Sequence, residues 1–183
     1  YGVTEFGGTE GVGVLFSYNP ANGAFAVLRN FSATLSSTAA GARPIRGPVI
    51  GANGRLYGTC SQGGLNNVGT MWEYNISTST FTKKFDFDAS PTGKGSTPRG
   101  RLMVHTNGTI YGTTQLGGTN NRGCIFSYTQ ATTTNTKLYS FPALPATATG
   151  AQPICGLTQA SNGLLYGTAA LGGANGFGTL FSF

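Results

Sequence analysis

The chain has 183 residues, including 30 glycines and 8 prolines, and only 9% of its residues are charged. This composition is typical of a turn-rich β protein and argues against a helical one. The formal net charge of +6 reflects a shortage of carboxylates, and the eleven Lys and Arg residues are scattered rather than gathered as nucleic-acid binding requires, so we expect no nucleic-acid partner.

Four copies of one 18-residue unit run through the chain. They begin at Tyr1, Tyr57, Tyr111 and Tyr166, so successive copies start 56, 54 and 55 residues apart. A fixed period of this kind indicates a tandem repeat in which each unit buries its apolar face against its neighbours. We therefore predict a single repeat domain over residues 1–183, divided near 1–43, 44–97, 98–152 and 153–183.

The second full repeat shows the predicted strands in chain order. Two β-prone runs, residues 99–106 and 109–115, flank Asn107-Gly108, a dipeptide that favours a type I′ hairpin turn with positive φ at both central residues. A glycine-rich connection leads to a third run at 124–128, and a fourth follows at 134–141. The same Asn-Gly dipeptide at 53–54 and 162–163 predicts two further hairpins of this type.

Each complete repeat is thus predicted to form four short antiparallel strands with no helical periodicity. Repeats of about 55 residues are typical of β-propeller blades, so the predicted fold class is all-β, a β-propeller-like array of four-stranded antiparallel blades. Because the sequence begins at a second strand and ends at a third, the prediction comprises fourteen strands and no closed ring. We expect self-association, or further repeats of the same parent chain, to complete the blades.

Aromatic residues and glycines recur at fixed places in the repeat. We expect the third-strand aromatics Phe16, Trp72, Phe126 and Phe181 to pack between neighbouring sheets. A glycine follows the first tyrosine of every copy and leaves room for a large neighbour. Three of these glycines are therefore predicted to be buried and intolerant of larger residues, namely Gly58, Gly112 and Gly167.

The pattern G-x-L-Y-G-T-x3-G-G-x-N, which runs here from Gly163 to Asn175, resembles the GloVer tandem repeats of choice-of-anchor bacterial surface proteins. The resemblance covers nearly the whole chain. It implies export from the cell, tandem arrays and a propeller-like arrangement, and it offers no catalytic residue to carry over. The chain departs from the pattern in showing no anchor and in having Val3 where the other copies have threonine.

The Gly-Gly loops are interpreted as tight turns, because neither a helix nor the lysine of a phosphate-binding loop follows them. A second interpretation concerns their polar side chains, which would project from one face and hydrogen-bond a glycan. The candidate glycan-binding residues are Asn66, Asn67, Asn120, Asn121, Arg122 and Asn175.

Chemistry-bearing residues are few. His105 is the single histidine and is interpreted as a strand-end residue, and the carboxylates Glu5 and Glu10 are replaced in the other copies. The three cysteines lack metal-ligand spacing and are expected to be small buried side chains, with one disulfide as the alternative. We expect no catalytic residue, no metal and no cofactor. The cysteines are Cys60, Cys124 and Cys155.

Three sites, Asn30, Asn75 and Asn107, match the N-glycosylation acceptor pattern, as chance also supplies in a chain so rich in Asn, Ser and Thr. There is no apolar run long enough to cross a bilayer. The sequence therefore predicts a non-enzymatic extracellular structural or adhesive repeat module at a cell surface or in a filament. The alternative function is a lectin-like module that binds surface glycans.

Overall fold

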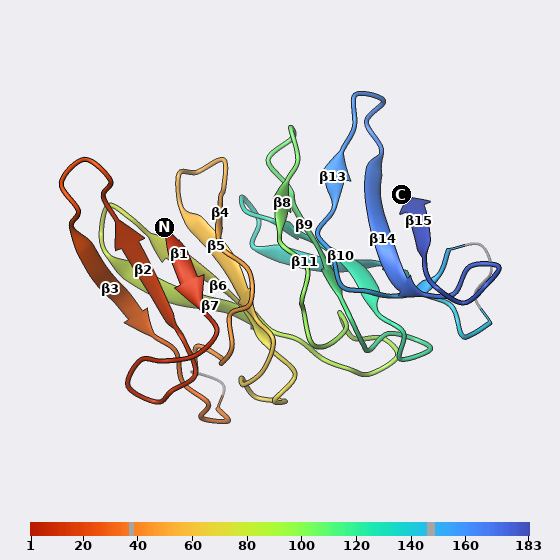
Figure 1. The fold of residues 1–183 in the computed structure, drawn as a ribbon, viewed down its shortest axis with the longest axis horizontal. Helices are drawn as coiled ribbons and strands as arrows, with labels where there is room; N and C mark the ends of the chain where they lie inside the picture. The colour runs from red at the N-terminus through yellow and green to blue at the C-terminus, as the bar shows by residue number, and fades with distance from the viewer. Residues whose placement is uncertain (37–38, 146–148) are drawn as a thin grey trace. The chain divides into compact units, whose positions relative to one another are not determined.

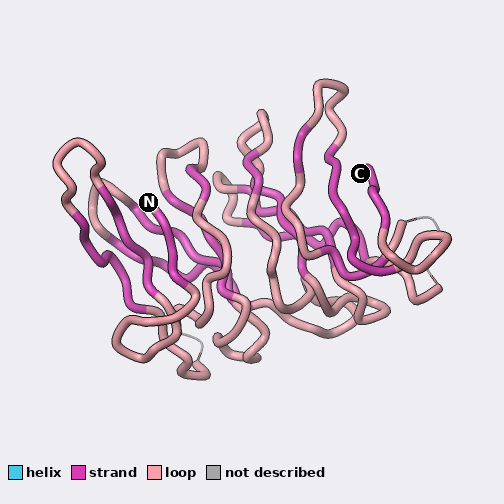
Figure 2. Tube along the Cα trace, viewed as in Figure 1, coloured by secondary structure: helices cyan, strands magenta, loops and turns pink. Residues whose placement is uncertain are grey.

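The described part of the chain folds into β-strands, turns and loops. The computed structural model describes residues 1–36, 39–145 and 149–183, and in these ranges it contains fifteen strands and no helix (Figures 1 and 2). The all-β prediction is therefore confirmed. The chain divides into two compact units, Tyr1–Asp86 and Phe87–Phe183.

The first unit contains two antiparallel sheets. The first sheet has three strands in the order β1-β2-β3, and the second has four in the order β4-β5-β6-β7. Both are simple meanders in which each strand pairs with the next along the chain. The strands are β1 (Gly2–Thr4), β2 (Val14–Tyr18), β3 (Phe25–Asn30), β4 (Val49–Ile50), β5 (Leu56–Cys60), β6 (Thr70–Asn75) and β7 (Thr80–Asp86).

The second unit repeats this plan. One sheet has the order β8-β9-β10-β11, and in the other β14 pairs with β12, β13 and β15. Fourteen strands were predicted, and the additional one is β12, part of the connection between repeats, which pairs with the far end of β14. The strands are β8 (Met103–Val104), β9 (Ile110–Thr114), β10 (Cys124–Thr129), β11 (Thr134–Ser140), β12 (Ala151–Pro153), β13 (Thr158–Gln159), β14 (Leu165–Leu171) and β15 (Thr179–Ser182).

The three predicted hairpins form, but their turns are not of type I′. Gly54 has φ +75°, whereas Asn53 is absent from the residues with positive φ. The Gly54 amide donates to Gly51 O at 3.0 Å, and the Asn53 Oδ1 accepts a hydrogen bond from the Arg55 amide at 3.1 Å. A wider loop with a single left-handed glycine thus replaces the two-residue turn, and the asparagine side chain stabilises it by accepting the Arg55 amide without positive φ at Asn53.

A glycine and an aromatic ring face each other across the second and third strands of every repeat. The strand register pairs Gly2 with Phe16, Gly58 with Trp72, Gly112 with Phe126, and Gly167 with Phe181. The ring lies over the glycine, since a Cβ built on Gly112 would come within 2.5 Å of Phe126 Cζ. Gly58, Gly112 and Gly167 are buried, as predicted.

Each sheet has two faces, which we name by what they carry. The rear face carries the aromatic ring that lies over the glycine, and the forward face carries the residue before it, such as Leu15. In the first unit, forward-face Leu15 lies in one core with rear-face Leu56 and Trp72 of the next sheet. In the second unit, Ile125 and Phe181 pack in the same forward-to-rear manner.

A phenylalanine that follows the fourth strand completes each of these contacts. Phe31 lies 5.7 Å from the Trp72 ring, and Phe141 lies 5.1 Å from Phe181 in an edge-to-face contact. Phe87 makes the equivalent edge-to-face contact with Phe126 at 5.1 Å. Edge-to-face aromatic pairs at this separation are favourable. The prediction of packing between neighbouring sheets is therefore confirmed for Trp72, Phe126 and Phe181. It is wrong for Phe16, which is half-buried and contacts Phe25 of its own sheet.

A residue with left-handed backbone geometry precedes the proline of each connection between repeats. Arg43 has φ +55°, and Thr97 and Gln152 have nearly the same value. The Arg43 amide donates to Val12 O at 2.9 Å, while its carbonyl accepts from the Ser61 amide at 3.0 Å. This geometry costs free energy for a non-glycine residue, and here it joins the backbones of two successive repeats.

We predict that Gly112→Ala lowers the free energy of unfolding by about 1–3 kcal/mol, because the new methyl group overpacks the buried Phe126 and Leu102. The matched control is Gly47→Ala, whose Cβ would meet nothing within 4 Å. Equilibrium denaturation of both variants measures the difference. Equal stability of the two variants would contradict the proposed role of the glycine.

Candidate functional site

The glycine-rich loops use part of their asparagine set for their own structure. Asn67 and Asn121 have φ +53° and +52°, and the equivalent positions in the other two copies are Gly11 and Gly176. The Asn67 Oδ1 accepts from the Gly63 amide at 3.0 Å, and the Asn121 Oδ1 accepts from the Gly117 amide at 2.8 Å. These two amides act as internal caps of the loops.

Like Asn67 and Asn121, most of the remaining members of the predicted glycan-binding set are exposed. Asn120 is exposed, and its Nδ2 donates to Phe141 O at 3.2 Å, which ties the loop to the packing phenylalanine. Asn66 and Asn175 are exposed, and Arg122 is half-buried. The role of these residues in glycan binding stays a prediction. Asn67 and Asn121, which occupy the same position of the repeat, stabilise their own loops.

A buried carboxylate that the sequence did not single out forms the densest polar network of the first unit. Glu73 on β6 is buried, and its Oε2 accepts a 2.5 Å hydrogen bond from Tyr57 Oη. Its Oε1 accepts from Arg55 Nη1 at 2.8 Å, and Lys84 Nζ lies 3.6 Å from Oε2. Asn53 Nδ2 donates to the same tyrosine oxygen at 2.9 Å.

This network exists in one repeat because the residue paired with the repeat tyrosine differs there. Glu73 faces Tyr57 in the strand register, whereas Ser127 faces Tyr111 and Ser182 faces Tyr166. Burial by itself would raise the pKa of Glu73, but the Tyr57 hydrogen bond, Lys84 and Arg55 together lower it below the ordinary value. The sequence signal that could have identified Glu73 is a charged residue at a position where the other copies have serine.

The other chemistry-bearing residues lie apart from this network or serve local contacts. His105 lies at the end of a strand, as predicted, and its Nδ1 accepts from the Asn107 amide at 3.1 Å. Glu5 pairs with Arg43 at 3.7 Å, and Glu10 accepts from Ser32 Oγ at 3.0 Å. Among the residues that the structure describes, no group of three His, Cys, Asp or Glu side chains is placed to hold a metal.

The three cysteines are free thiols. Cys60 and Cys124 are buried, as predicted, and burial raises the pKa of both. Cys155 is exposed, so the prediction of a buried side chain is wrong there. It lies in the segment between β12 and β13, where its carbonyl accepts a hydrogen bond from Thr113 Oγ1 at 2.8 Å.

The asparagines of the three glycosylation patterns accept hydrogen bonds from backbone amides through Oδ1. The donors are the Thr9 amide for Asn30, the Ser77 amide for Asn75, and the Thr109 amide for Asn107. Asn30 and Asn107 are exposed, and Asn75 is half-buried. Glycosylation of these residues stays a prediction.

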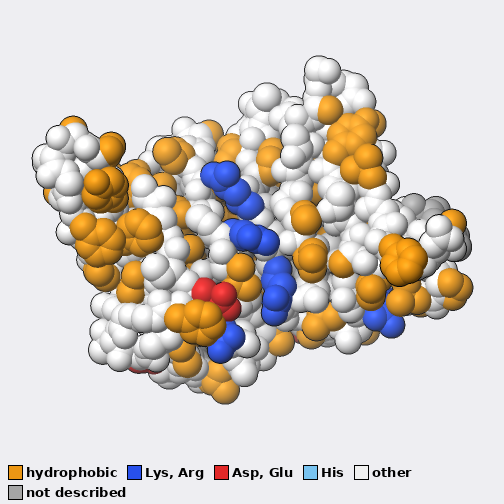
Figure 3. Space-filling model, in the orientation of Figure 1, with side chains coloured by type: hydrophobic (Ala, Val, Ile, Leu, Met, Phe, Trp, Pro, Cys, Tyr) orange, Lys and Arg blue, Asp and Glu red, His pale blue; other side chains and the backbone are white. Residues whose placement is uncertain are grey.

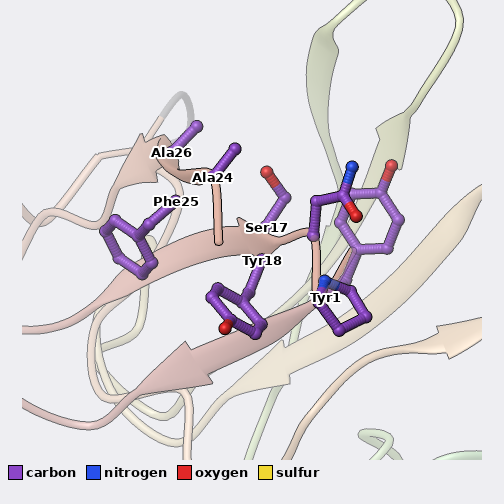
Figure 4. Close-up of a pocket in the computed structure, with 8 residues that line it drawn as sticks. Tyr1, Ser17, Tyr18, Ala24, Phe25 and Ala26 are labelled. Atoms are coloured by element: carbon purple, nitrogen blue, oxygen red, sulfur yellow. The ribbon is translucent and has the colours of Figure 1, made fainter. Parts of the chain in front are cut away.

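The rear face of the first sheet carries uncovered aromatic side chains. Phe16 lies 5.3 Å from Phe25, and Tyr18 and Phe25 are exposed. Hydrophobic side chains gather over β2 and β3 in Figure 3. In Figure 4, Tyr18 and Phe25 point to one side of the sheet, and Ser17 and Ala26 point to the other.

A hollow of about 410 Å³ runs around the end of this sheet, beside the turn that joins β2 and β3. It combines aromatic rings with an amide and a hydroxyl group, and the sequence analysis did not find it. The residues that line the hollow come from parts of the chain that meet only in the folded sheet. The lining residues are Tyr1, Ser17, Tyr18, Asn19, Pro20, Ala24, Phe25 and Ala26.

The fold defines the class of protein as a tandem array of antiparallel β-sheets, each with a glycine-rich loop between two of its neighbouring strands. A family model described as the Gloeobacter/Verrucomicrobia repeat matches residues 1–183, and the chain belongs to this repeat family. The resemblance found in the sequence is thereby confirmed. No curated protein matches the chain. No helix capable of crossing a bilayer occurs in the ranges that the structure describes.

We predict that Glu73→Gln lowers the free energy of unfolding at pH 7 by about 1–3 kcal/mol, because it removes hydrogen bonds to a buried charge. The pKa of Glu73 in the folded state lies below its ordinary value of 4.5. The stabilisation is therefore complete above that value and is lost as the pH falls through the folded-state pKa. Denaturant titrations at several pH values measure the difference in free energy of unfolding between the unmodified protein and Glu73→Gln. This difference should become smaller in acid.

Glu5→Gln supplies the matched control, since it makes the same chemical change at an exposed carboxylate with a 3.7 Å ion pair. It should alter stability at pH 7 by less than Glu73→Gln does. A Glu73→Gln protein as stable as the original chain at pH 7 would show that the network contributes nothing.

Proposed function

We propose that this protein is a non-enzymatic, extracellular structural repeat module whose sheets are arranged as propeller-type blades. The observation that supports the proposal is the packing of the recurring aromatic side chains against neighbouring repeats. Trp72, Phe126 and Phe181 are buried against the phenylalanine of a preceding repeat. When the recurring residues of a repeat pack against the neighbouring repeat, the same contact can add further repeats to the array.

The polar features support the same function. The recurring loop asparagines cap their own loops, and Glu73 is surrounded by hydrogen-bond donors. A nucleophile or general base needs a side chain that faces a substrate, whereas Glu73 is buried. Surface attachment and adhesion are consistent with the low charge of the chain and with its family of bacterial repeats.

The exposed thiol offers a direct test of the extracellular location. A membrane-impermeant maleimide should label Cys155 on intact cells that produce the parent protein, while Cys60 and Cys124 remain buried. The expected result is a labelled product without lysis and no labelling of the Cys155→Ser protein. Labelling that appears only after lysis would contradict an extracellular module.

Glycan binding is the second candidate function, and the aromatic hollow at the first sheet favours it. Exposed tyrosine and phenylalanine rings beside Asn19 offer stacking surface and hydrogen bonds to a sugar. Binding to a glycan array should then be lost in Tyr1→Ala and kept in Phe177→Ala, which removes an exposed aromatic ring elsewhere. An array without signal for the unmodified chain would exclude this function for the glycans presented.

A further inference from the structure

Three asparagine-glycine pairs lie at equivalent hairpin tips, which join β4 to β5, β8 to β9, and β13 to β14 (Figure 1). The asparagines are Asn53, Asn107 and Asn162, and all three are exposed. Glycine has no side chain, so its amide nitrogen is open to close approach by the Cγ of a preceding asparagine. Asparagine is one of the thermolabile residues of proteins, and in such a pair it can lose its side-chain amide. The three tips therefore form a matched set for this reaction.

The backbone holds the three tips in the same way. In each tip the glycine amide donates to a carbonyl oxygen three residues earlier, over 2.8–3.0 Å. The asparagine Oδ1 accepts a hydrogen bond from the amide two residues later, at 3.1 Å for Asn53, 2.9 Å for Asn107 and 3.1 Å for Asn162. Because these bonds are shared, they do not distinguish one asparagine from another.

The side-chain nitrogen is held by a tyrosine in two of the tips. Asn53 Nδ2 donates to Tyr57 Oη at 2.9 Å. Asn162 Nδ2 donates to Tyr166 Oη at the same distance. In both repeats the asparagine side chain is therefore fixed at its oxygen and at its nitrogen.

In the third repeat a histidine ring lies at the equivalent tyrosine instead. His105 stands where the other copies have Gly51 and Ala160, and its ring centroid is 5.7 Å from that of Tyr111. Within the ranges that the structure describes, Asn107 Nδ2 donates no hydrogen bond. The group that leaves in the reaction is thus held by one bond fewer than in the two equivalent tips.

We propose that Asn107 is a site of spontaneous deamidation and isomerisation that reacts faster than its two equivalents. Hydroxide from the solvent takes the proton of the Gly108 amide, and the amide nitrogen forms a bond to Asn107 Cγ. The bond from Cγ to Nδ2 breaks, and Nδ2 takes a proton from water and leaves as ammonia. Water then opens the resulting succinimide ring at either carbonyl and gives aspartate or isoaspartate. This modification goes beyond the structural function proposed above.

The expected difference in rate follows from what must move. The Gly108 carbonyl accepts a hydrogen bond from Gln130 Nε2 at 2.6 Å, which holds the glycine side of the tip. Ring closure therefore requires the asparagine side chain to rotate towards the glycine nitrogen. At Asn53 and Asn162 this rotation also breaks the bond to tyrosine. One additional hydrogen bond of ordinary strength makes the reaction about 2- to 10-fold slower.

The modification falls beside a contact between two repeats. The Thr106 amide donates to Gln159 Oε1 at 3.2 Å, and Gln159 Nε2 donates to Thr106 Oγ1 at 3.2 Å. Gln159 lies on β13 of the fourth repeat. Isoaspartate adds a methylene group to the main chain at residue 107, and either product adds a negative charge. Deamidation of Asn107 therefore alters the backbone next to these bonds and lowers the net charge of +6 by one.

Peptide mapping by tandem mass spectrometry tests the proposal on the full chain, incubated in mildly alkaline buffer. The deamidation rate of each asparagine is divided by its rate in the chain unfolded by guanidinium chloride, which removes the influence of the flanking residues. The ratio for Asn107 should exceed those for Asn53 and Asn162 by about 2- to 10-fold. Equal ratios, or an Asn107 that does not react in the folded chain, overturn the proposal.

Two tyrosine variants test the cause of the difference. Tyr166→Phe removes the acceptor of Asn162 Nδ2 and should raise the rate at Asn162 by about 2- to 10-fold. Tyr111→Phe is the matched control at another half-buried tyrosine, and it should leave the rate at Asn107 unchanged. A constant rate at Asn53 in the same molecules shows that each variant is folded. An unchanged rate at Asn162 in folded Tyr166→Phe also overturns the proposal.

Discussion

The contact between a third-strand aromatic ring and the glycine across the strand pair is the constraint on which the other packing depends. With a side chain at Gly58 or Gly112, the ring could not occupy the space over the glycine. From that place the ring contacts the phenylalanine of the preceding repeat. The glycine gives up side-chain packing in its own strand, and the repeat gains a contact between sheets that are distant in sequence.

Many polar residues in this protein also stabilise its fold, because they form hydrogen bonds within the chain. The left-handed asparagines close the glycine-rich loops, and Arg43 links two repeats through its backbone. The buried carboxylate of Glu73 is balanced by two cations and a tyrosine. A buried carboxylate without these partners would be costly, so the network explains how one repeat tolerates glutamate at a serine position.

The copies of the repeat also differ in how far equivalent apolar residues are buried. Several positions that are packed in one copy are exposed in another. Leu180 and Phe25 are examples, and their equivalents Ile125 and Phe81 lie within packed cores. Exposed apolar patches of this kind mark interaction surfaces in soluble proteins. The structural function proposed above rests on one property of the repeat, the packing of the forward face of one sheet on the rear face of the next within each unit.

The sequence by itself determined the repeat, the order of its strands, the hairpins and the buried glycines, because these follow from alternation and turn residues within short stretches. Tertiary structure decided what depends on residues far apart. The turns are wider loops instead of type I′ turns, and β12 is an additional strand. The side chains of Asn67 and Asn121 hydrogen-bond within their own loops. Arg55, Tyr57 and Lys84 surround Glu73. The fold also leaves Cys155 exposed. Local patterns fix which residues form strands, whereas burial and hydrogen-bond partners depend on which strands and repeats become neighbours.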